Sequence, residues 1–229
     1  MLQNTPTIVR NLIIINVLFF LGSMVLGVGV STELFAGTYP GSPYFKPWQI
    51  VTHMFMHGGL AHIAFNMFAL YMFGSQLERM WGPKRFLNFY LISGLGGFFL
   101  HELVLGIQLH EQFGTFFPSL DVVVPRGASS LVSAQYIEYT FGRVVGASGA
   151  IFGLLLAFGM LFPNTRLMLL FPPIPIKAKY FVIGYGAIEL FMGMQNNAGD
   201  NTAHFAHLGG MLFGYVLLKY WQKDRGTFY

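Results

Sequence analysis

The sequence is poor in charged residues. Asp, Glu, Lys and Arg make up 10% of its 229 residues, whereas a soluble domain carries about 25%. Hydrophobic residues make up 54% of the chain. So few charges would leave the surface of a water-soluble protein largely apolar. The composition therefore excludes that class and indicates a membrane protein.

Cysteine is absent. Its absence excludes disulfide bonds and metal sites built from thiolates. The net charge is +4, but no basic stripe runs along a polar segment, so the sequence predicts no nucleic-acid partner. We expect no cofactor and no bound metal.

Long hydrophobic runs dominate what is present. Each is close to the roughly 20 residues that a helix needs to cross a bilayer. The first run is longer than the core of a signal peptide, about 7–15 residues, and we interpret it as a retained span. The sequence predicts an all-α polytopic membrane protein, a single domain over residues 1–229, with six transmembrane helices at about 11–30, 60–77, 86–109, 144–162, 180–194 and 202–218.

The basic residues predict the orientation, because Lys and Arg collect in cytoplasmic loops. Ten of the thirteen would flank one side of the membrane, and only Lys46, Arg126 and Arg143 the other. Both termini are therefore expected in the cytoplasm. Two long connections, 31–59 and 110–143, then lie outside, and the second is apolar enough to cap the bundle or lie on the lipid surface.

Polar side chains recur at one depth in three of these spans. Ser148 is near the start of the fourth, His207 near the start of the sixth, and His62 and Asn66 in the first turns of the second. All three spans enter from outside. Because polar groups in lipid are costly and face the bundle interior, we expect these four residues to share a shallow layer.

Small residues predict how the fourth and sixth spans meet. Stripes of small residues let two membrane helices approach closely. Such an approach would bring the Ser148 hydroxyl to the His207 ring, with Phe152 one turn further along to pack against that ring. The two stripes are Gly149, Gly153 and Ala157 on one span, and Ala206, Gly210 and Gly214 on the other.

These residue types suit acyl transfer. A serine hydroxyl becomes a nucleophile when a base takes its proton, and histidine is the usual base. The Ser148 backbone N–H, the Asn66 amide and His62 could stabilise an oxyanion. No acidic residue lies at the same depth in these three spans, so the sequence predicts a Ser–His dyad whose histidine is oriented by packing.

Other interpretations remain open for the same residues. Gly146-Ala147-Ser148-Gly149 could serve only as a helix contact. His62, His204 and His207 could hold a metal, although no carboxylate or cysteine completes that set. His53 and His57 are expected to order a loop or line a cavity. Glu189 is a candidate functional group because it is a carboxylate within a span, or it hydrogen-bonds between helices.

The sequence resembles the rhomboid intramembrane serine proteases. The resemblance covers about residues 11–218 and rests on three motifs in order: His62-x-x-x-Asn66, Gly146-Ala147-Ser148-Gly149 and Ala206-His207-x-x-Gly210. It implies Ser148 as nucleophile, His207 as base, and an oxyanion hole of His62, Asn66 and the Ser148 amide. Phe152 stands where many members have tyrosine, and Gln49 stands where many have arginine.

The predicted function is an intramembrane serine endopeptidase. It would cleave transmembrane segments of membrane proteins near the extracytoplasmic face, as a multi-pass protein of a bacterial inner membrane. A catalytically silent member that binds client helices is the alternative. A transporter is a third possibility, but it predicts inverted repeats, and none is evident in the sequence.

Overall fold

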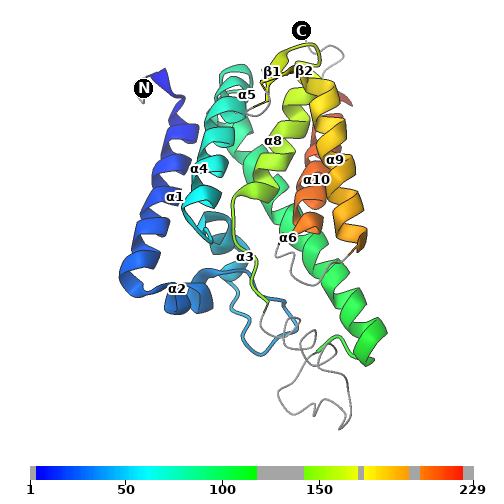
Figure 1. Cartoon of the computed structure of the whole chain (residues 1–229). Coiled ribbons are helices and arrows are strands. Elements are labelled where there is room, and N and C mark those ends of the chain that lie inside the picture. Colours follow the sequence, from blue (N-terminus) through cyan, green and yellow to red (C-terminus); the bar gives the residue numbers. More distant parts are fainter. Residues whose placement is uncertain (1–3, 118–141, 170–172, 196–201, 224–229) are drawn as a thin grey trace.

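Helices form most of the regular structure in the computed structural model, which describes residues 4–117, 142–169, 173–195 and 202–223. Figure 1 shows the long helices standing side by side, with α1 beginning and α10 ending at the same end of the bundle. The helical prediction is confirmed. By length and composition, two of the described helices, α1 and α6, could each cross a membrane alone, so the number of crossings stays a prediction.

The first predicted span is shifted toward the N-terminus. Helix α1 covers Thr7–Leu26, and a separate helix, α2, covers Val28–Phe35. The break falls at Gly27, whose φ of 87° is not helical. The earlier start follows from an unexpected cap: the Glu78 carboxylate accepts hydrogen bonds from Ile8 N–H (2.9 Å) and Val9 N–H (2.8 Å). A carboxylate at a helix N-terminus satisfies free donors and opposes the positive end of the dipole.

The second and third predicted spans are helical throughout. The second is built from α4 (Leu60–Ala69), a π-helical turn (Leu70–Gly74) and α5 (Ser75–Trp81). The third, α6, runs over Pro83–Phe113, with Pro83 at the position where the missing N–H costs nothing. Most of the connection that follows α6 lies outside the described residues.

The fourth predicted span begins too early. Helix α8 covers Ser148–Leu161, so residues 144–147 are not part of it. Gly146 has a φ of 129°, a conformation that only glycine adopts without strain. Ser148 is therefore the first residue of α8, rather than a residue one turn inside it.

A short hairpin lies between α8 and α9. Strands β1 (Arg166–Met168) and β2 (Pro175–Lys177) pair antiparallel, with Leu167 opposite Ile176. This hairpin departs from the all-α prediction, because prolines around it cannot continue a helix. Helix α9 (Ala178–Gln195) and helix α10 (His204–Lys223) follow.

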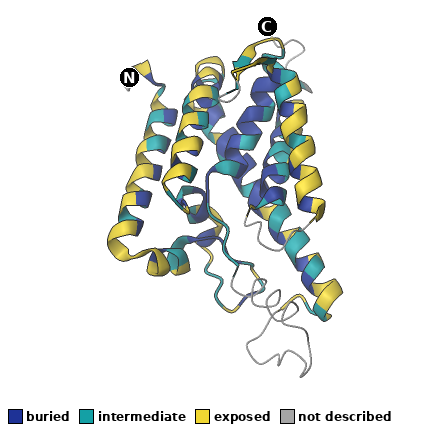
Figure 2. Ribbon diagram, viewed as in Figure 1, coloured by how far each residue is buried: buried dark blue, intermediate teal, exposed yellow. Residues whose placement is uncertain are grey.

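The centre of the bundle is an unusually close contact of α6, α8 and α10. A Cβ added to Gly210 would overlap the Gly149 carbonyl oxygen, and one added to Gly153 would lie 2.9 Å from the Gly210 oxygen. On the α6 side, a Cβ on Gly97 would lie 2.6 Å from the Ala206 oxygen. Figure 2 shows α8 as the most buried helix, with α1 and α9 exposed along their outer faces. The predicted contact between small-residue stripes is confirmed.

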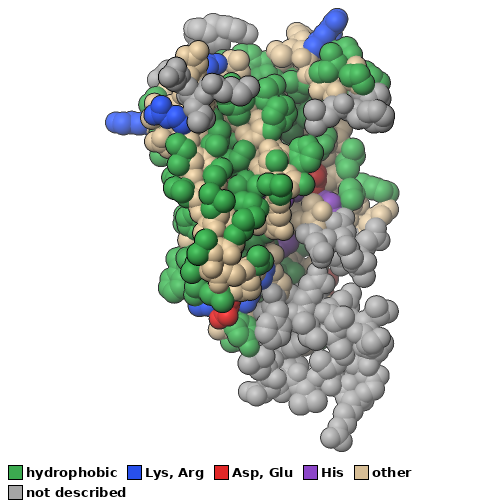
Figure 3. All heavy atoms as spheres, turned by 60° about the vertical axis from the view of Figure 1, so that its left-hand side comes forward, with side chains coloured by type: hydrophobic (Ala, Val, Ile, Leu, Met, Phe, Trp, Pro, Cys, Tyr) green, Lys and Arg blue, Asp and Glu red, His purple; other side chains and the backbone are tan. Residues whose placement is uncertain are grey.

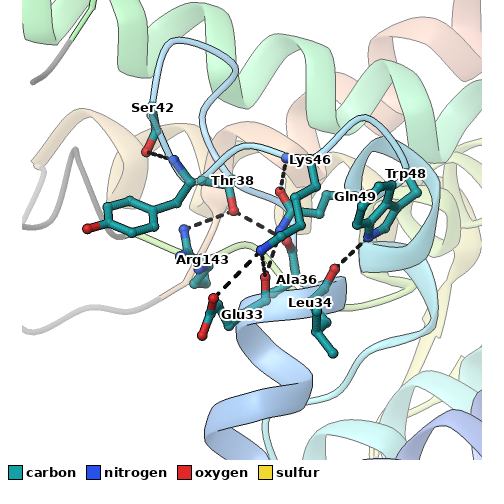
Figure 4. A network of polar contacts seen from close by, with 10 residues as sticks. Glu33, Leu34, Ala36, Thr38, Ser42, Lys46, Trp48, Gln49 and Arg143 are labelled. Atoms are coloured by element: carbon teal, nitrogen blue, oxygen red, sulfur yellow. Dashed lines mark hydrogen bonds and ion pairs between the residues drawn. The ribbon is translucent and has the colours of Figure 1, made fainter.

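Polar contacts order the loop between α2 and the short helix α3 (Gln49–Thr52), which continues into a 3-10 turn (His53–Phe55). The Gln49 amide donates to the Glu33 carbonyl oxygen (3.0 Å), and the Trp48 indole N–H donates to that of Leu34 (2.8 Å) (Figure 4). Gln49 is fully buried. The glutamine thus ties this loop to the end of α2 without an arginine.

The surface is consistent with a lipid-facing band. In Figure 3 hydrophobic side chains are spread over the described part of the visible face, and Lys and Arg lie towards its two ends. Exposed large hydrophobic residues are frequent on α1, where Leu18, Leu21 and Val25 are 61%, 52% and 87% exposed. In water such a face would promote aggregation, whereas in a bilayer it contacts acyl chains.

Gly210→Ala tests the close contact of α8 and α10. The added methyl group has no room against the Gly149 oxygen, so the two helices must move apart. We expect the free energy of unfolding to fall by about 3 kcal/mol or more. Thermal unfolding in detergent measures the change. Gly184→Ala on α9 is the matched control, because nothing lies within 4 Å of the added Cβ. Equal unfolding temperatures for the two variants would contradict the contact.

Candidate active site

The segment before α8 is held in an extended conformation against the loop that follows α2. Gly37 and Val144 exchange two backbone hydrogen bonds of 2.8 Å, and Arg143 donates to the Thr38 hydroxyl at 2.9 Å. Figure 4 shows Arg143 lying beside Thr38 in this network. The chain is thereby delivered to the helix start at a fixed position.

Gly146 makes the turn that presents Ser148. Its N–H donates to the His53 carbonyl oxygen at 2.9 Å, and its positive φ redirects the chain into α8. Ser148 then occupies the first position of the helix, where backbone N–H groups have no partner within the helix. Its hydroxyl and its amide are both near the end of α8 that faces the cavity described below.

His207 meets Ser148 across the contact of α8 and α10. Its Nε2 lies 2.8 Å from the Ser148 Oγ, a hydrogen-bonding distance. The Phe152 ring stacks on the imidazole with centroids 4.1 Å apart and planes 6° from parallel. The predicted stacking and the predicted approach of Ser148 to His207 are thus both present in the structure.

His62 and Asn66 line the other side of the serine. The Gly58 N–H donates to His62 Nδ1 at 3.3 Å, so the ring proton of neutral His62 is on Nε2. That Nε2 lies 2.9 Å from where a Cβ of Gly146 would be. The Asn66 side chain is buried, and its Nδ2 has no hydrogen-bond partner among the described residues. Two donors are therefore available beside Ser148.

These side chains share one open cavity of about 830 Å³. Its wall combines the start of α4, the segment before α8 and the start of α10. Apolar residues from α4 and α6 form part of the wall, so a peptide chain would meet both polar and apolar groups. The cavity is lined by His53, His62, Asn66, Phe98, Arg143, Ser148 and His207, among others.

The sequence matches the family model described as "Rhomboid domain" over residues 44–222. This match covers most of the chain and includes every residue of the cavity named above. The chain belongs to the rhomboid family. The helical membrane fold expected from the sequence is the fold of that family.

Named relatives are found in plants and bacteria. The chain is 30% identical to RHOMBOID-like protein 12, mitochondrial, of Arabidopsis thaliana, over 78% of the chain and 48% of the relative. It is 30% identical to rhomboid protease GluP of Bacillus subtilis, over 73% and 25% respectively, and 28% identical to rhomboid protease AarA of Providencia stuartii, over 74% and 54%. The chain thus spans about half or less of the length of these relatives.

The sequence marks Glu189 as a candidate but does not predict its partners. The structure puts its Oε2 2.9 Å from His207 Nδ1 and 2.7 Å from His204 Nδ1. A carboxylate therefore lies beside the His207 ring, in addition to the Phe152 ring that packs against it. The predicted site draws on the second, fourth and sixth spans, whereas Glu189 comes from the fifth. Its position inside a span was the available signal, but the rotation of α9 against α10 could not be read from the sequence.

The proposed histidine cluster also differs from the expectation. Among the described residues, the three that could share a metal ion are Glu189, His204 and His207, whose ligand atoms lie within 4.8 Å of one another. His62 is not in this group, and a carboxylate completes it. The predicted absence of a carboxylate beside these histidines is thus wrong.

His53 and His57 are buried in the segment between α2 and α4 of this rhomboid protein. His53 Nδ1 lies 2.9 Å from the Gln49 carbonyl oxygen, and its ring stacks on Phe98 at 4.6 Å. Burial lowers the pKa of His53 to about 4, and burial followed by repulsion from His62 lowers that of His57 to about 4. Both are neutral near pH 7, and His53 lines the cavity as expected.

Acid should destabilise this loop. Below about pH 6.5 an unfolded histidine binds a proton, whereas folded His53 stays neutral until about pH 4. Stability is therefore complete above pH 6.5 and falls toward pH 4, by about 3 kcal/mol for His53 at 1.4 kcal/mol per pKa unit. Unfolding temperatures measured from pH 7 to pH 4 check this. His53→Gln should give a flatter profile, and an unchanged slope would contradict the assignment.

Proposed function

We propose that this chain is an intramembrane serine endopeptidase with Ser148 as nucleophile and His207 as general base. The observation that carries the proposal is the 2.8 Å contact between Ser148 Oγ and His207 Nε2 at the edge of an open cavity. Bacterial relatives named as rhomboid proteases support the same reaction class. Retention of both residues argues against a silent member that only binds client helices.

The reaction follows from the two side chains. Ser148 Oγ attacks the peptide carbonyl carbon, forming a C–O bond, while its proton moves to His207 Nε2. The tetrahedral intermediate then breaks the C–N bond, and the same proton passes to the leaving amine. A water molecule hydrolyses the acyl-enzyme, with His207 again taking and returning the proton. No cofactor enters this sequence.

The oxyanion would be stabilised by neutral donors. His62 Nε2–H, held in that tautomer by the Gly58 N–H, and the unpaired Asn66 Nδ2 both line the cavity. The Ser148 backbone N–H is a third donor, at the start of α8. Donors already fixed in position in a site of low polarity stabilise a developing charge without reorganising.

The proposed site lies within the bilayer. Helix α8 has 14 residues and rises about 21 Å, less than the roughly 30 Å of a bilayer core. Ser148 at its outer end is then below the membrane surface, at a depth where substrate transmembrane segments pass. We place the chain as a six-crossing domain in a bacterial inner membrane with both termini in the cytoplasm, which agrees with α1 beginning and α10 ending at one end (Figure 1).

Active-site substitution tests this proposal. In purified protein in detergent, Ser148→Ala or His207→Ala should lower the rate of cleavage of a single-span model substrate by at least about 10³-fold. A fluorophosphonate probe should modify the wild-type protein at Ser148, as read by peptide mass spectrometry.

Ser23→Ala is the matched control. The Ser23 hydroxyl donates to the Phe20 carbonyl oxygen within α1, so its removal should leave cleavage and labelling unchanged. Full activity in Ser148→Ala, or labelling at another serine, would refute the assignment. An inactive wild-type protein that no probe labels would instead favour the client-binding alternative.

A further inference from the structure

A buried carboxylate lies directly behind the proposed base. Glu189 is on α9 and is 7% exposed. Its Oε2 lies 2.9 Å from Nδ1 of His207, and Nε2 of the same ring contacts Ser148 at 2.8 Å. The three side chains come from α9, α10 and α8. Their alignment therefore depends on how these three helices pack against one another.

Oε2 of Glu189 contacts two histidines, His204 and His207. Residues 204 and 207 are three apart on α10 and therefore project from one face of the helix. The bond to His204 Nδ1 is aligned at 2.7 Å. The contact with His207 Nδ1 is short, but the ring N–H does not point along it. Catalytic hydrogen bonds are often poorly aligned before substrate binds and tighten in the complex.

The carboxylate selects the tautomer that a base requires. To accept the Ser148 proton, neutral His207 must keep Nε2 free and hold its own proton on Nδ1. A carboxylate oxygen 2.9 Å from Nδ1 attracts an N–H there and repels a bare lone pair. When Ser148 gives up its proton, the same oxygen faces the positive imidazolium, whose charge it stabilises in a site of low polarity.

The other titratable groups around His207 do not supply this effect. They are His62 from α4, His101 from α6 and His204 from α10 itself, and α8 adds the Ser148 hydroxyl. A histidine contributes no negative charge, so among the residues that the structure describes Glu189 is the group that can stabilise the imidazolium. Stacking on Phe152 fixes the plane of the ring but does not choose its tautomer.

We propose that Glu189 is a positioning residue for His207, so that the Ser–His pair operates as the reactive end of a Ser148–His207–Glu189 chain. The inference rests on the proposed function, because it concerns the same base. During attack the Ser148 proton moves to Nε2, the Nδ1 proton stays on the ring, and Glu189 remains a carboxylate throughout.

A metal ion on Glu189, His204 and His207 would require the opposite arrangement. It would bind Nδ1 lone pairs, leaving the His207 proton on Nε2 and the ring unable to accept a proton from Ser148. The two interpretations therefore make opposite predictions about chelators. If Glu189 positions His207, a chelator leaves cleavage unchanged.

Glu189→Gln in the full chain, purified in detergent, is the direct experiment. A glutamine N–H₂ directed at Nδ1 favours the wrong tautomer, and we expect kcat for the model substrate to fall about 10²- to 10⁴-fold with KM within about threefold. Loss of the negative charge also makes the imidazolium less stable. The acidic limb of the kcat/KM profile should therefore move to lower pH.

Glu102→Gln provides the matched control, since Glu102 is another buried carboxylate, on α6, and has no contact with His207 in the described structure. Its kcat and acidic limb should equal those of the wild type. Glu189→Asp keeps the charge, and we expect partial recovery of kcat with the acidic limb close to that of the wild type. If Glu189→Gln fails to fold, Glu189→Asp still tests the proposal, because its kcat should lie below that of the wild type.

The outcomes separate the two proposals. Wild-type kcat and an unshifted acidic limb in Glu189→Gln, with Ser148→Ala inactive, would overturn the positioning role and leave the protease assignment intact. Unchanged kcat in Glu189→Asp would overturn it too. Stoichiometric zinc in the purified protein, with cleavage restored by a chelator, would replace it with a metal site. Absence of Ser148-dependent cleavage in the wild type would count against the proposed function itself.

Discussion

The backbone contact between α8 and α10 is the constraint on which the rest of the site depends. The Gly149 carbonyl oxygen occupies the space that a side chain at Gly210 would need. Ser148 precedes Gly149 by one residue, and His207 precedes Gly210 by one turn. Lipid tails are as apolar as the helix side chains, so the hydrophobic effect does little to drive helices together in a bilayer. Close packing of small residues holds them together instead. The same packing sets the distance between hydroxyl and imidazole.

In the proposed mechanism, two histidines with opposite tautomers divide the chemistry of the cavity. The Gly58 N–H occupies Nδ1 of His62, which makes its Nε2 a donor. On His207 the Glu189 carboxylate lies against Nδ1, which leaves Nε2 as an acceptor toward Ser148. His62 is thereby suited to donate a hydrogen bond to an oxyanion, and His207 is suited to accept a proton. Each role is set by a neighbour from a different segment, rather than by the histidine itself.

The sequence predicts those parts of the structure that follow from periodicity and composition. Stripes of small residues fix which faces of α8 and α10 meet, and this is enough to pair Ser148 with His207 and Phe152. Helix limits are less predictable where tertiary contacts decide them. The capping of α1 by Glu78 and the extended segment before Ser148 both depend on residues far away in the sequence.

Glu189 shows the same limit within the site. Its distance from His207 depends on how α9 is rotated against α10, and α9 lacks the small-residue stripe that defines the contact of α8 with α10. A lone carboxylate in an apolar helix is recognisable in the sequence as a functional candidate. Its partner depends on how the helices pack, which the sequence does not show. The tautomer of His62 is likewise set by the Gly58 amide, which carries no side-chain signal.

An experimental structure of the fluorophosphonate adduct tests the central claim most directly, because the phosphonyl group mimics the tetrahedral intermediate. The claim is that the packing of α8 and α10 builds a Ser–His pair facing preformed donors. The account predicts a covalent bond to Ser148 Oγ and a phosphoryl oxygen within hydrogen-bonding distance, about 3 Å, of His62 Nε2 and Asn66 Nδ2. A phosphoryl oxygen turned away from both donors, or an adduct on another residue, would contradict it.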